Sequence, residues 1–386
     1  MMHFPPKLGR RDALKAGAVV AAASSLSAPQ LAQAQSQAQS VPAPDKTMEV
    51  KGDVFTPIPD ANPLEAKIAV FTTVSSDVDA SISFYRDLIG MEIISDEKLP
   101  NGISTAPGIG RAGRRHVLLA MPEGLSMPEQ DFRKAVPEPS FRRAVRVLEA
   151  PPGAEAIRPR PGSSPNDPGL MVMEGGTRDA AESYHALASV GTPMISPPRY
   201  YYFRNTMWGT DVDSMSYAPF GPGGEQMFIT ASIRSDQQLV RSVGIHNGFG
   251  SASITSLDQR PVNAFFEKAF GLKRTSQMEC YQENVDELTG APKGTYFLWG
   301  NVGSGLGIEV WEMKAPSGTI LPCSLDKTGL AMLTLKVNDL RKCRAMCAEA
   351  GIEPVGEGAM PNLQNERPEG FTLRGAVGEL FEVVQA

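Results

Sequence analysis

The sequence predicts an α+β fold built from four similar modules, each a strand, a helix and three further strands. Three observations support this: a strong internal repeat, a fainter second repeat, and a chain length that one hydrophobic core seldom accommodates. The 386 residues suggest two to three domains of about 150 residues each. With 41% hydrophobic and 21% charged residues, the composition is that of a globular protein.

The strong repeat relates the segments 67–94 and 253–272. In each, an apolar run ends at an aspartate, an amphipathic segment rich in aromatic residues follows, and a glycine ends it. Four residue pairs keep the same offset of 181 positions: Asp77 and Asp258, Phe84 and Phe265, Tyr85 and Phe266, and Gly90 and Gly271. Chance rarely preserves four such spacings, so we interpret the segments as two copies of one module.

The fainter repeat relates segments 169–191 and 330–351. Asp179 lies twelve positions before Gly191, and Asp339 lies twelve positions before Gly351. Both glycines are well placed to end a helix in the left-handed conformation. Alternating or apolar runs then predict the later strands of the modules, at 117–121, 144–148, 215–217, 226–230, 296–299, 306–311, 371–373 and 379–384.

The N-terminal segment is typical of an export signal. Arg10 and Arg11 precede a weakly apolar stretch at 16–28, and Ala32 and Ala34 fit the small-residue pattern that signal peptidase accepts. This resembles a twin-arginine signal peptide over residues 1–34, which predicts export of the folded chain and a periplasmic or secreted location. An Arg-bearing amphipathic helix or a mitochondrial presequence is the alternative. Residues 35–63, rich in Gln, Ser, Pro and Ala, predict a disordered linker.

The net charge and the lengths of the apolar runs argue against nucleic acid and a membrane-spanning segment. The formal net charge of -6 disfavours nucleic acid, and no apolar run reaches the ~18 residues of a membrane span. We therefore expect a small-molecule substrate or ligand, with a homodimer as a candidate assembly. The four cysteines are interpreted as structural thiols, and a disulfide among them is left open.

Three motifs carry a family resemblance. They are Phe-Tyr-Arg-Asp-Leu-Ile-Gly-Met at 84–91, Phe-Phe-Glu-Lys-Ala-Phe-Gly-Leu at 265–272, and Gly-Glu-Leu-Phe-Glu-Val-Val-Gln at 378–385. Together with the module pattern they resemble the vicinal oxygen chelate superfamily of glyoxalases, bleomycin-resistance proteins and extradiol dioxygenases. The resemblance implies two tandem domains, 64–235 and 244–386, each a pair of βαβββ modules forming a cupped half-barrel.

The resemblance also implies a divalent metal in the cup. The family takes ligands from the first strand of a module, usually His or Gln about seven residues before the aspartate, and a Glu from the last strand. The first-strand positions here are poor ligands: Val70, Val172, Ser251 and Met332. The last-strand position matches Glu309 and Glu382, with Glu149 as a candidate in the first module and Phe228 in the second.

The metal expectation is therefore open. The cofactor is unknown: none, or a divalent metal held atypically by Glu309, Glu382 and His246. An extradiol dioxygenase is disfavoured, because its two expected histidine positions are Ser251 and Met332.

The segment 199–217 concentrates tyrosines, charged residues and one tryptophan. Its aromatic residues could simply pack on a sheet, or they could line a pocket for a flat or apolar ligand. Alternation along a strand predicts that Tyr200 and Tyr202 share one face and Tyr201 takes the other. Asp211 or Asp213 is a candidate general base, and Arg204 a candidate cation for an anionic or enolate-like oxygen.

The leading hypothesis is an exported enzyme of the lyase or isomerase kind that acts on a small oxygenated or aromatic compound without the usual metal triad. Its candidate residues are, for catalysis, Glu309, Glu382, Asp211 and Arg204, and, for substrate binding, Tyr200, Tyr202, Trp208 and His246. The alternative is a periplasmic protein that binds or sequesters a small molecule. A third hypothesis is a partner-binding protein whose fold has lost its site.

Overall fold

The computed structural model describes residues 62–99, 113–122, 143–159, 163–203, 212–233, 245–280, 282–295, 297–303, 306–313, 319–360 and 369–386. These residues lie within one compact unit, 48–386. The predicted signal peptide, nearly all of the predicted linker, and the candidate residues Arg204, Trp208 and Asp211 lie outside the described residues. None of the described helices is long and apolar enough to cross a membrane.

The four predicted modules are all present. The elements of the first and second modules are β1 (Lys67–Ser75), α3 (Val78–Ser83), the π-helical turn η2 (Phe84–Leu88), β2 (Glu92–Lys98), β3 (Arg115–Ala120) and β4 (Ala144–Glu149), then β5 (Gly169–Thr177), α4 (Ala180–Ser189), β6 (Met194–Phe203), β7 (Val212–Pro219) and β8 (Gln226–Ser232).

The third and fourth modules follow the same order. Their elements are β9 (His246–Ser256), α5 (Gln259–Phe270), β10 (Arg274–Cys280), α6 (Glu283–Thr289), β11 (Phe297–Val302) and β12 (Ile308–Met313), then β13 (Gly329–Val337), α7 (Leu340–Glu349), β14 (Gly356–Glu357), β15 (Gly370–Arg374) and β16 (Leu380–Gln385). The short helix α6 was not predicted from the sequence.

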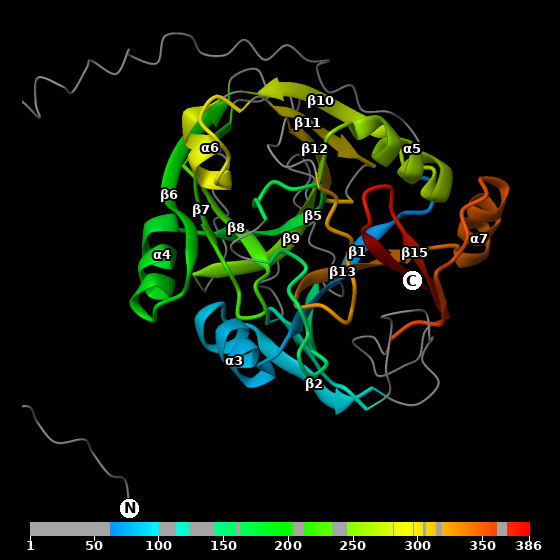
Figure 1. Cartoon of the computed structure of the whole chain (residues 1–386), viewed down its shortest axis with the longest axis horizontal. Helices are drawn as coiled ribbons and strands as arrows, with labels where there is room; N and C mark the ends of the chain where they lie inside the picture. The colour runs from blue at the N-terminus through cyan, green and yellow to red at the C-terminus, as the bar shows by residue number, and fades with distance from the viewer. Residues whose placement is uncertain are drawn as a thin grey trace, which may run out of the picture. The chain divides into compact units, whose positions relative to one another are not determined.

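The fold class predicted from the sequence is confirmed, but the modules pair differently from the expectation. The strand order β14-β15-β16-β13-β1-β4-β3-β2 combines the first module with the fourth, and the order β10-β11-β12-β9-β5-β8-β7-β6 combines the second with the third. The expected pairs 64–235 and 244–386 therefore do not match the sheets. In Figure 1, blue β1 lies beside orange β13, and in the other sheet β5 lies beside β9.

The physical reason lies in the first strands. Within each sheet the two first strands pair with each other in antiparallel fashion, β1 with β13 and β5 with β9. All four first strands are almost wholly buried, so their pattern fits either partner equally well. We call the sheet containing β1 the first sheet and the one containing β5 the second sheet.

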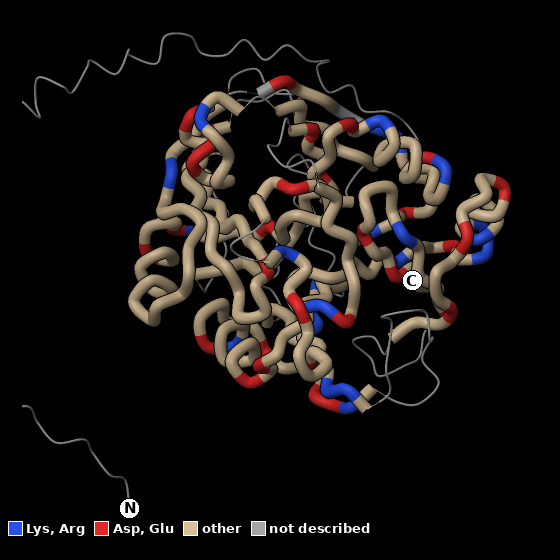
Figure 2. The backbone as a smooth tube through the Cα atoms, viewed as in Figure 1, with Lys and Arg blue, Asp and Glu red and all other residues tan. Residues whose placement is uncertain are grey.

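The aspartates that defined the repeat cap the module helices. The side chains of Asp77, Asp179, Asp258 and Asp339 each accept a hydrogen bond from a backbone N–H in the first turn of the following helix. The glycines Gly90, Gly191, Gly271 and Gly351 all have φ between 67° and 88°. The predicted left-handed helix ends are thus confirmed. Figure 2 shows charged positions along α5 and α7, which leave their apolar sides for packing.

Aromatic side chains join the two sheets. Phe381 of β16 packs against three phenylalanines of α5, with ring centroids 5.6 Å from Phe265, 5.3 Å from Phe266 and 6.4 Å from Phe270. On the other side, the Tyr85 hydroxyl donates a 2.6 Å hydrogen bond to Glu225, which lies just before β8. One large hydrophobic cluster therefore spans both sheets.

We expect Phe381→Ala to lower the free energy of unfolding by about 3–5 kcal/mol, because it leaves a cavity beside three rings. Leu257→Ala is the matched control, since Leu257 is 42% exposed. Urea denaturation followed by far-UV circular dichroism measures both. Equal effects of the two substitutions would contradict this packing.

Candidate functional site

Strand register defines four equivalent positions on each sheet. In every module the first strand pairs in parallel with the last, and the residue five positions before the helix-capping aspartate lies beside a last-strand residue. In the first sheet these pairs are Thr72 with Arg146 and Thr334 with Glu382. In the second sheet they are Glu174 with Phe228 and Ser253 with Glu309. We call the two faces that carry these quartets the first cup and the second cup.

The second cup contains a pair of carboxyl groups. Ser251 donates a 2.9 Å hydrogen bond to Glu174, and Ser253 hydrogen-bonds to both Glu174 and, at 3.4 Å, Glu309. The indole N–H of Trp311 donates to Glu309 at 3.0 Å. Glu309 is buried, whereas Glu174 is half-buried. Every hydrogen bond named here comes from an uncharged group.

This environment changes the acidity of both groups. Burial raises the pKa of Glu309 well above its usual range, and the nearby charge of Glu174 raises it further. Burial also raises the pKa of Glu174, although its serine donors and its hydrogen bond with Glu309 oppose the shift. Two adjacent carboxyls in an apolar surrounding favour a state in which they share one proton. In such a state one carboxyl can act as an acid and the other as a base.

Aromatic and apolar side chains surround this pair. Trp311 stacks on Phe297 at a centroid distance of 5.2 Å and lies 5.3 Å from Trp299 and 6.1 Å from Phe228. Val285 and Leu288 of α6 pack into the same cluster. Helix α6 and its N-cap residue also contact the edge strand β6. Gln282 accepts a hydrogen bond from the backbone N–H of Tyr202 and donates one to its carbonyl oxygen, and Asn284 donates to the carbonyl oxygen of Tyr200.

The tyrosine alternation predicted from the sequence is present in β6. Tyr201 and Phe203 pack together on the side of the second cup, where the Tyr201 hydroxyl lies 3.1 Å from the Ser216 hydroxyl. Burial raises the pKa of Tyr201, and the charge of Glu174 contributes. Tyr200 and Tyr202 share the opposite face, with ring centroids 6.0 Å apart, and Tyr200 donates to Asp213 at 2.6 Å. Tyr201 is therefore the tyrosine of this segment that faces the cup.

The first cup has different chemistry. Arg146 Nη1 donates to Glu382 at 3.1 Å and to Thr72 at 3.2 Å. Thr334 and the backbone N–H of Met360 also donate to Glu382, each at 2.6 Å. Arg146 and Glu382 are both buried. This cup is therefore organised around a buried ion pair.

The structure separates residues that the sequence analysis grouped. Glu309 and Glu382 lie on different sheets, so they do not share a cup. His246, at the start of β9, lies 2.6 Å from the hydroxyl of Ser183 on α4. Burial lowers the pKa of His246 to about 4. Glu309, Glu382 and His246 thus do not form one metal site.

Glu149 lies at the end of β4, where it accepts a hydrogen bond from the backbone N–H of Arg115. The last-strand position in the quartet for which Glu149 was the candidate is occupied by Arg146.

Two functional candidates were missed in the sequence. Glu174 and Arg146 both lie within apolar strands where a charged residue is unusual. That burial signal could have identified them. The family pattern directs attention to the residue seven positions before the aspartate, whereas the quartet residue lies five positions before it, two residues further along the strand on the same face.

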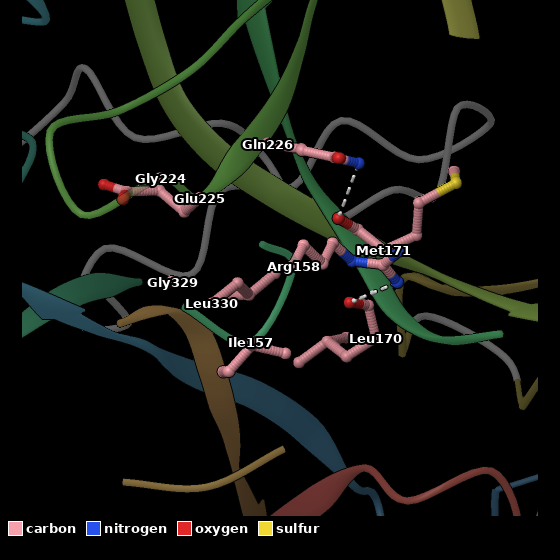
Figure 3. A pocket seen from close by; sticks show the side chains of 9 residues that line it. All are labelled: Ile157, Arg158, Leu170, Met171, Gly224, Glu225, Gln226, Gly329 and Leu330. Atoms are coloured by element: carbon pink, nitrogen blue, oxygen red, sulfur yellow. Dashed lines mark hydrogen bonds between the residues drawn. The ribbon is translucent and has the colours of Figure 1, made fainter. Parts of the chain in front are cut away.

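A narrow cavity of about 10 Å³ lies at the seam of the two sheets, between Arg158, Leu170, Glu225 and Leu330 (Figure 3). Its volume is that needed by a single water molecule. Arg158 donates to the carbonyl oxygens of Asp167 and Leu170, at 2.9 and 3.2 Å, so its guanidinium fastens the loop that precedes β5. We assign this cavity no functional role.

Comparison with known proteins agrees with the module architecture. Residues 67–213 match the family described as the Glyoxalase/Bleomycin resistance protein/Dioxygenase superfamily. A comparison with curated proteins found no match.

Several solved structures are similar to this chain at low identity. Glyoxalase I from Zea mays is 12% identical, with a TM-score of 0.49 over 83% of this chain and 92% of that one. The cppA protein from Streptococcus pneumoniae TIGR4 is 10% identical, with a TM-score of 0.38 over 83% and 99% of the two chains. A superfamily member from Sphaerobacter thermophilus is 20% identical, with a TM-score of 0.24 over 42% of this chain and 94% of that one.

Neither glyoxalase-type cup presents the ligand set that the sequence resemblance implied for a divalent metal. The first quartet holds the guanidinium of Arg146, whose positive charge opposes a second cation. In the second quartet the ring of Phe228 offers no ligand atom, and the two carboxyls hydrogen-bond to neighbouring side chains. No group of three or more His, Cys, Asp or Glu within the described ranges is arranged to hold a metal. We therefore derive no chemical step through a metal.

Replacing Glu309 by Gln should change how stability depends on pH. Because the folded state raises the pKa of Glu309, unfolding releases a proton above the unfolded value of about 4.3, and rising pH destabilises the wild type. A glutamine side chain at this position has no such proton. The stability advantage of E309Q should grow by up to about 1.4 kcal/mol per pH unit above that value until the folded pKa is reached.

Urea denaturation at several pH values measures this difference, with the exposed Glu353→Gln as control. Parallel curves for wild type and E309Q would contradict the buried environment.

Tyr201→Phe should lower the free energy of unfolding by about 1 kcal/mol, because it removes a half-buried hydrogen bond to Ser216. Tyr200→Phe removes a bond on the solvent side and should cost less, about 0.5 kcal/mol or under. Denaturant titration of the two variants decides the orientation of the strand, and the reverse ranking would refute it.

Proposed function

We propose that this chain is an exported glyoxalase-type enzyme of the lyase or isomerase kind that moves a proton on a small oxygenated or aromatic compound in the second cup. The observation that carries this proposal is the pair Glu174 and Glu309, two adjacent carboxyls whose pKa values are both raised. Carboxyl groups perturbed in this way occur often at catalytic sites.

The pair supplies both partners of a proton transfer. The ionised carboxyl takes a proton from a carbon next to a carbonyl group, while the protonated carboxyl donates its proton to another position of the substrate. The two carboxyls exchange roles, and the substrate leaves with its atoms and charge unchanged. We assign the ionised role to Glu174, the less buried of the two. Glu309, with the larger shift, starts protonated.

Neighbouring groups fit this chemistry. The hydroxyls of Ser251 and Ser253 fix the orientation of Glu174. Tyr201, whose raised pKa keeps it protonated, is a hydrogen-bond donor for a developing enolate oxygen. The indole and phenyl rings form an apolar wall suited to a flat substrate. Tyr200 and Tyr202 face away from this cup and are not part of the proposed site.

Proton exchange in D₂O tests this function even when the product of the reaction is unidentified. A panel of small aromatic and hydroxylated ketones is incubated with the purified chain, and proton NMR records the loss of signal at the carbon beside the carbonyl. We expect catalysed exchange for at least one compound, and a decrease of about 10²- to 10⁴-fold in E174Q and E309Q.

Glu225→Gln is the matched control, since Glu225 is a buried carboxyl with a raised pKa that bonds Tyr85 outside both cups. Exchange that is equal in wild type and E309Q would overturn the proposal. Stoichiometric binding of a ketone without any exchange would instead support the alternative, a binding or sequestering protein.

The proposal includes the exported location predicted from the N-terminal segment. Replacing Arg10 and Arg11 by Lys should then retain the precursor in the cytoplasm, as immunoblots of cell fractions would reveal.

A further inference from the structure

His116 in the first cup has unused hydrogen-bonding capacity. Its side chain is fully buried, yet neither ring nitrogen has a hydrogen-bond partner within the described part of the chain. A neutral imidazole carries one donor and one acceptor, and leaving both unsatisfied inside a protein is destabilising. Such a residue calls for an explanation, and a ligand that bonds the imidazole would supply one.

The sheet places this imidazole beside the ion pair. His116 lies opposite Leu148 on β4, and the pair Leu118 and Arg146 follows on the same two strands, so His116 and Arg146 lie two residues apart along the same face. The charges of Arg146 and Glu382 both act on His116. Asp96 on β2 is the third charge acting on it, and Glu97 lies directly opposite on the same strand.

The surroundings define what could bind. A small apolar cluster borders these groups on the same face: Ala69, Val70, Leu118, Ala120 and Ala144. Glu382 already accepts hydrogen bonds from Arg146, Thr334 and Met360. A ligand in this cup would therefore meet the nitrogen donors of an imidazole and a guanidinium next to short apolar side chains.

We propose that the first cup is a second binding site, separate from the proposed catalytic cup, for a small monocarboxylate with a short apolar chain. The carboxylate accepts hydrogen bonds from His116 and from the guanidinium of Arg146, and its alkyl part lies against the alanine-rich cluster. The guanidinium of Arg146 thus supplies the positive charge that faces the bound carboxylate in the first cup.

Charge balance makes binding depend on protons. Arg146 and Glu382 form an ion pair, and burial together with the charge of Arg146 lowers the pKa of His116 to about 4, so the imidazole is neutral near pH 7. A bound carboxylate adds one negative charge and stabilises protonated His116. One proton is taken from solvent for each carboxylate bound, and affinity falls as pH rises.

Isothermal titration of the purified full chain with sodium butyrate tests this site, with butyramide as the uncharged probe of the same shape. Titrations between about pH 5 and pH 7, in two buffers of different ionisation enthalpy, count the protons taken up. We expect one butyrate and about one proton per chain, with affinity decreasing over this range. Butyramide should bind at least about tenfold more weakly.

Two variants of His116 separate a ligand role from a structural one. Both H116Q and H116L should abolish the proton uptake and weaken butyrate binding at least about tenfold. H116L should in addition denature at a higher temperature than the ligand-free wild type, because a leucine leaves no buried nitrogen unsatisfied. His185→Gln, on the exposed side of α4, is the control and should bind like the wild type.

Absence of butyrate binding, binding without proton uptake, or equal binding of butyramide would each overturn the proposal. So would unchanged binding in H116L, and a lower denaturation temperature of that variant would identify His116 as structural. Because E309Q leaves the first cup intact, it should retain butyrate binding whatever the outcome of the exchange experiment.

Discussion

The parallel pairing of the first and last strands within each module is the constraint on which both proposed sites depend. The capping aspartate fixes where the helix begins, and the residue five positions earlier then lies beside a last-strand residue. A shift of one residue in this pairing would turn Glu309 or Glu382 to the opposite face. The register therefore decides whether these carboxyls meet a partner or become isolated buried charges.

The same strand pairing accommodates a buried carboxyl group in two opposite ways. In the first cup the buried charge of Glu382 is balanced by Arg146, and two further donors complete its hydrogen bonds. In the second cup Glu309 has no cationic neighbour among the described residues that act on it, so its proton affinity increases instead. Equivalent positions of one repeated module thus differ: in the first cup an opposite charge balances the carboxylate, and in the second cup burial favours the uncharged carboxyl, as the proposed acid–base pair requires.

The helices and their ends could be predicted from the sequence because they depend on interactions between residues close together in the chain. The Asp–Gly spacing identified helices that begin with a side-chain cap and end with a left-handed glycine, as at Asp258 and Gly271. The pairing of modules was not readable, because the first strands are buried and apolar throughout and carry no signal that selects a partner. Likewise Glu309 could be placed on a last strand, but its partner Glu174 could not, since that contact crosses from β5 to β12 by way of β9.

His116 and Glu309 show why burial alone does not identify a site. Both are buried titratable groups whose pKa values shift toward the uncharged form. Glu309 has donors that hold its carboxyl in place, so its altered acidity is compatible with a fixed catalytic role. His116 has none within the described residues, and its imidazole contributes nothing to stability that leucine could not. A ligand would supply the missing partner of His116, which is the physical ground for proposing the first cup as a ligand site and the second as the catalytic one.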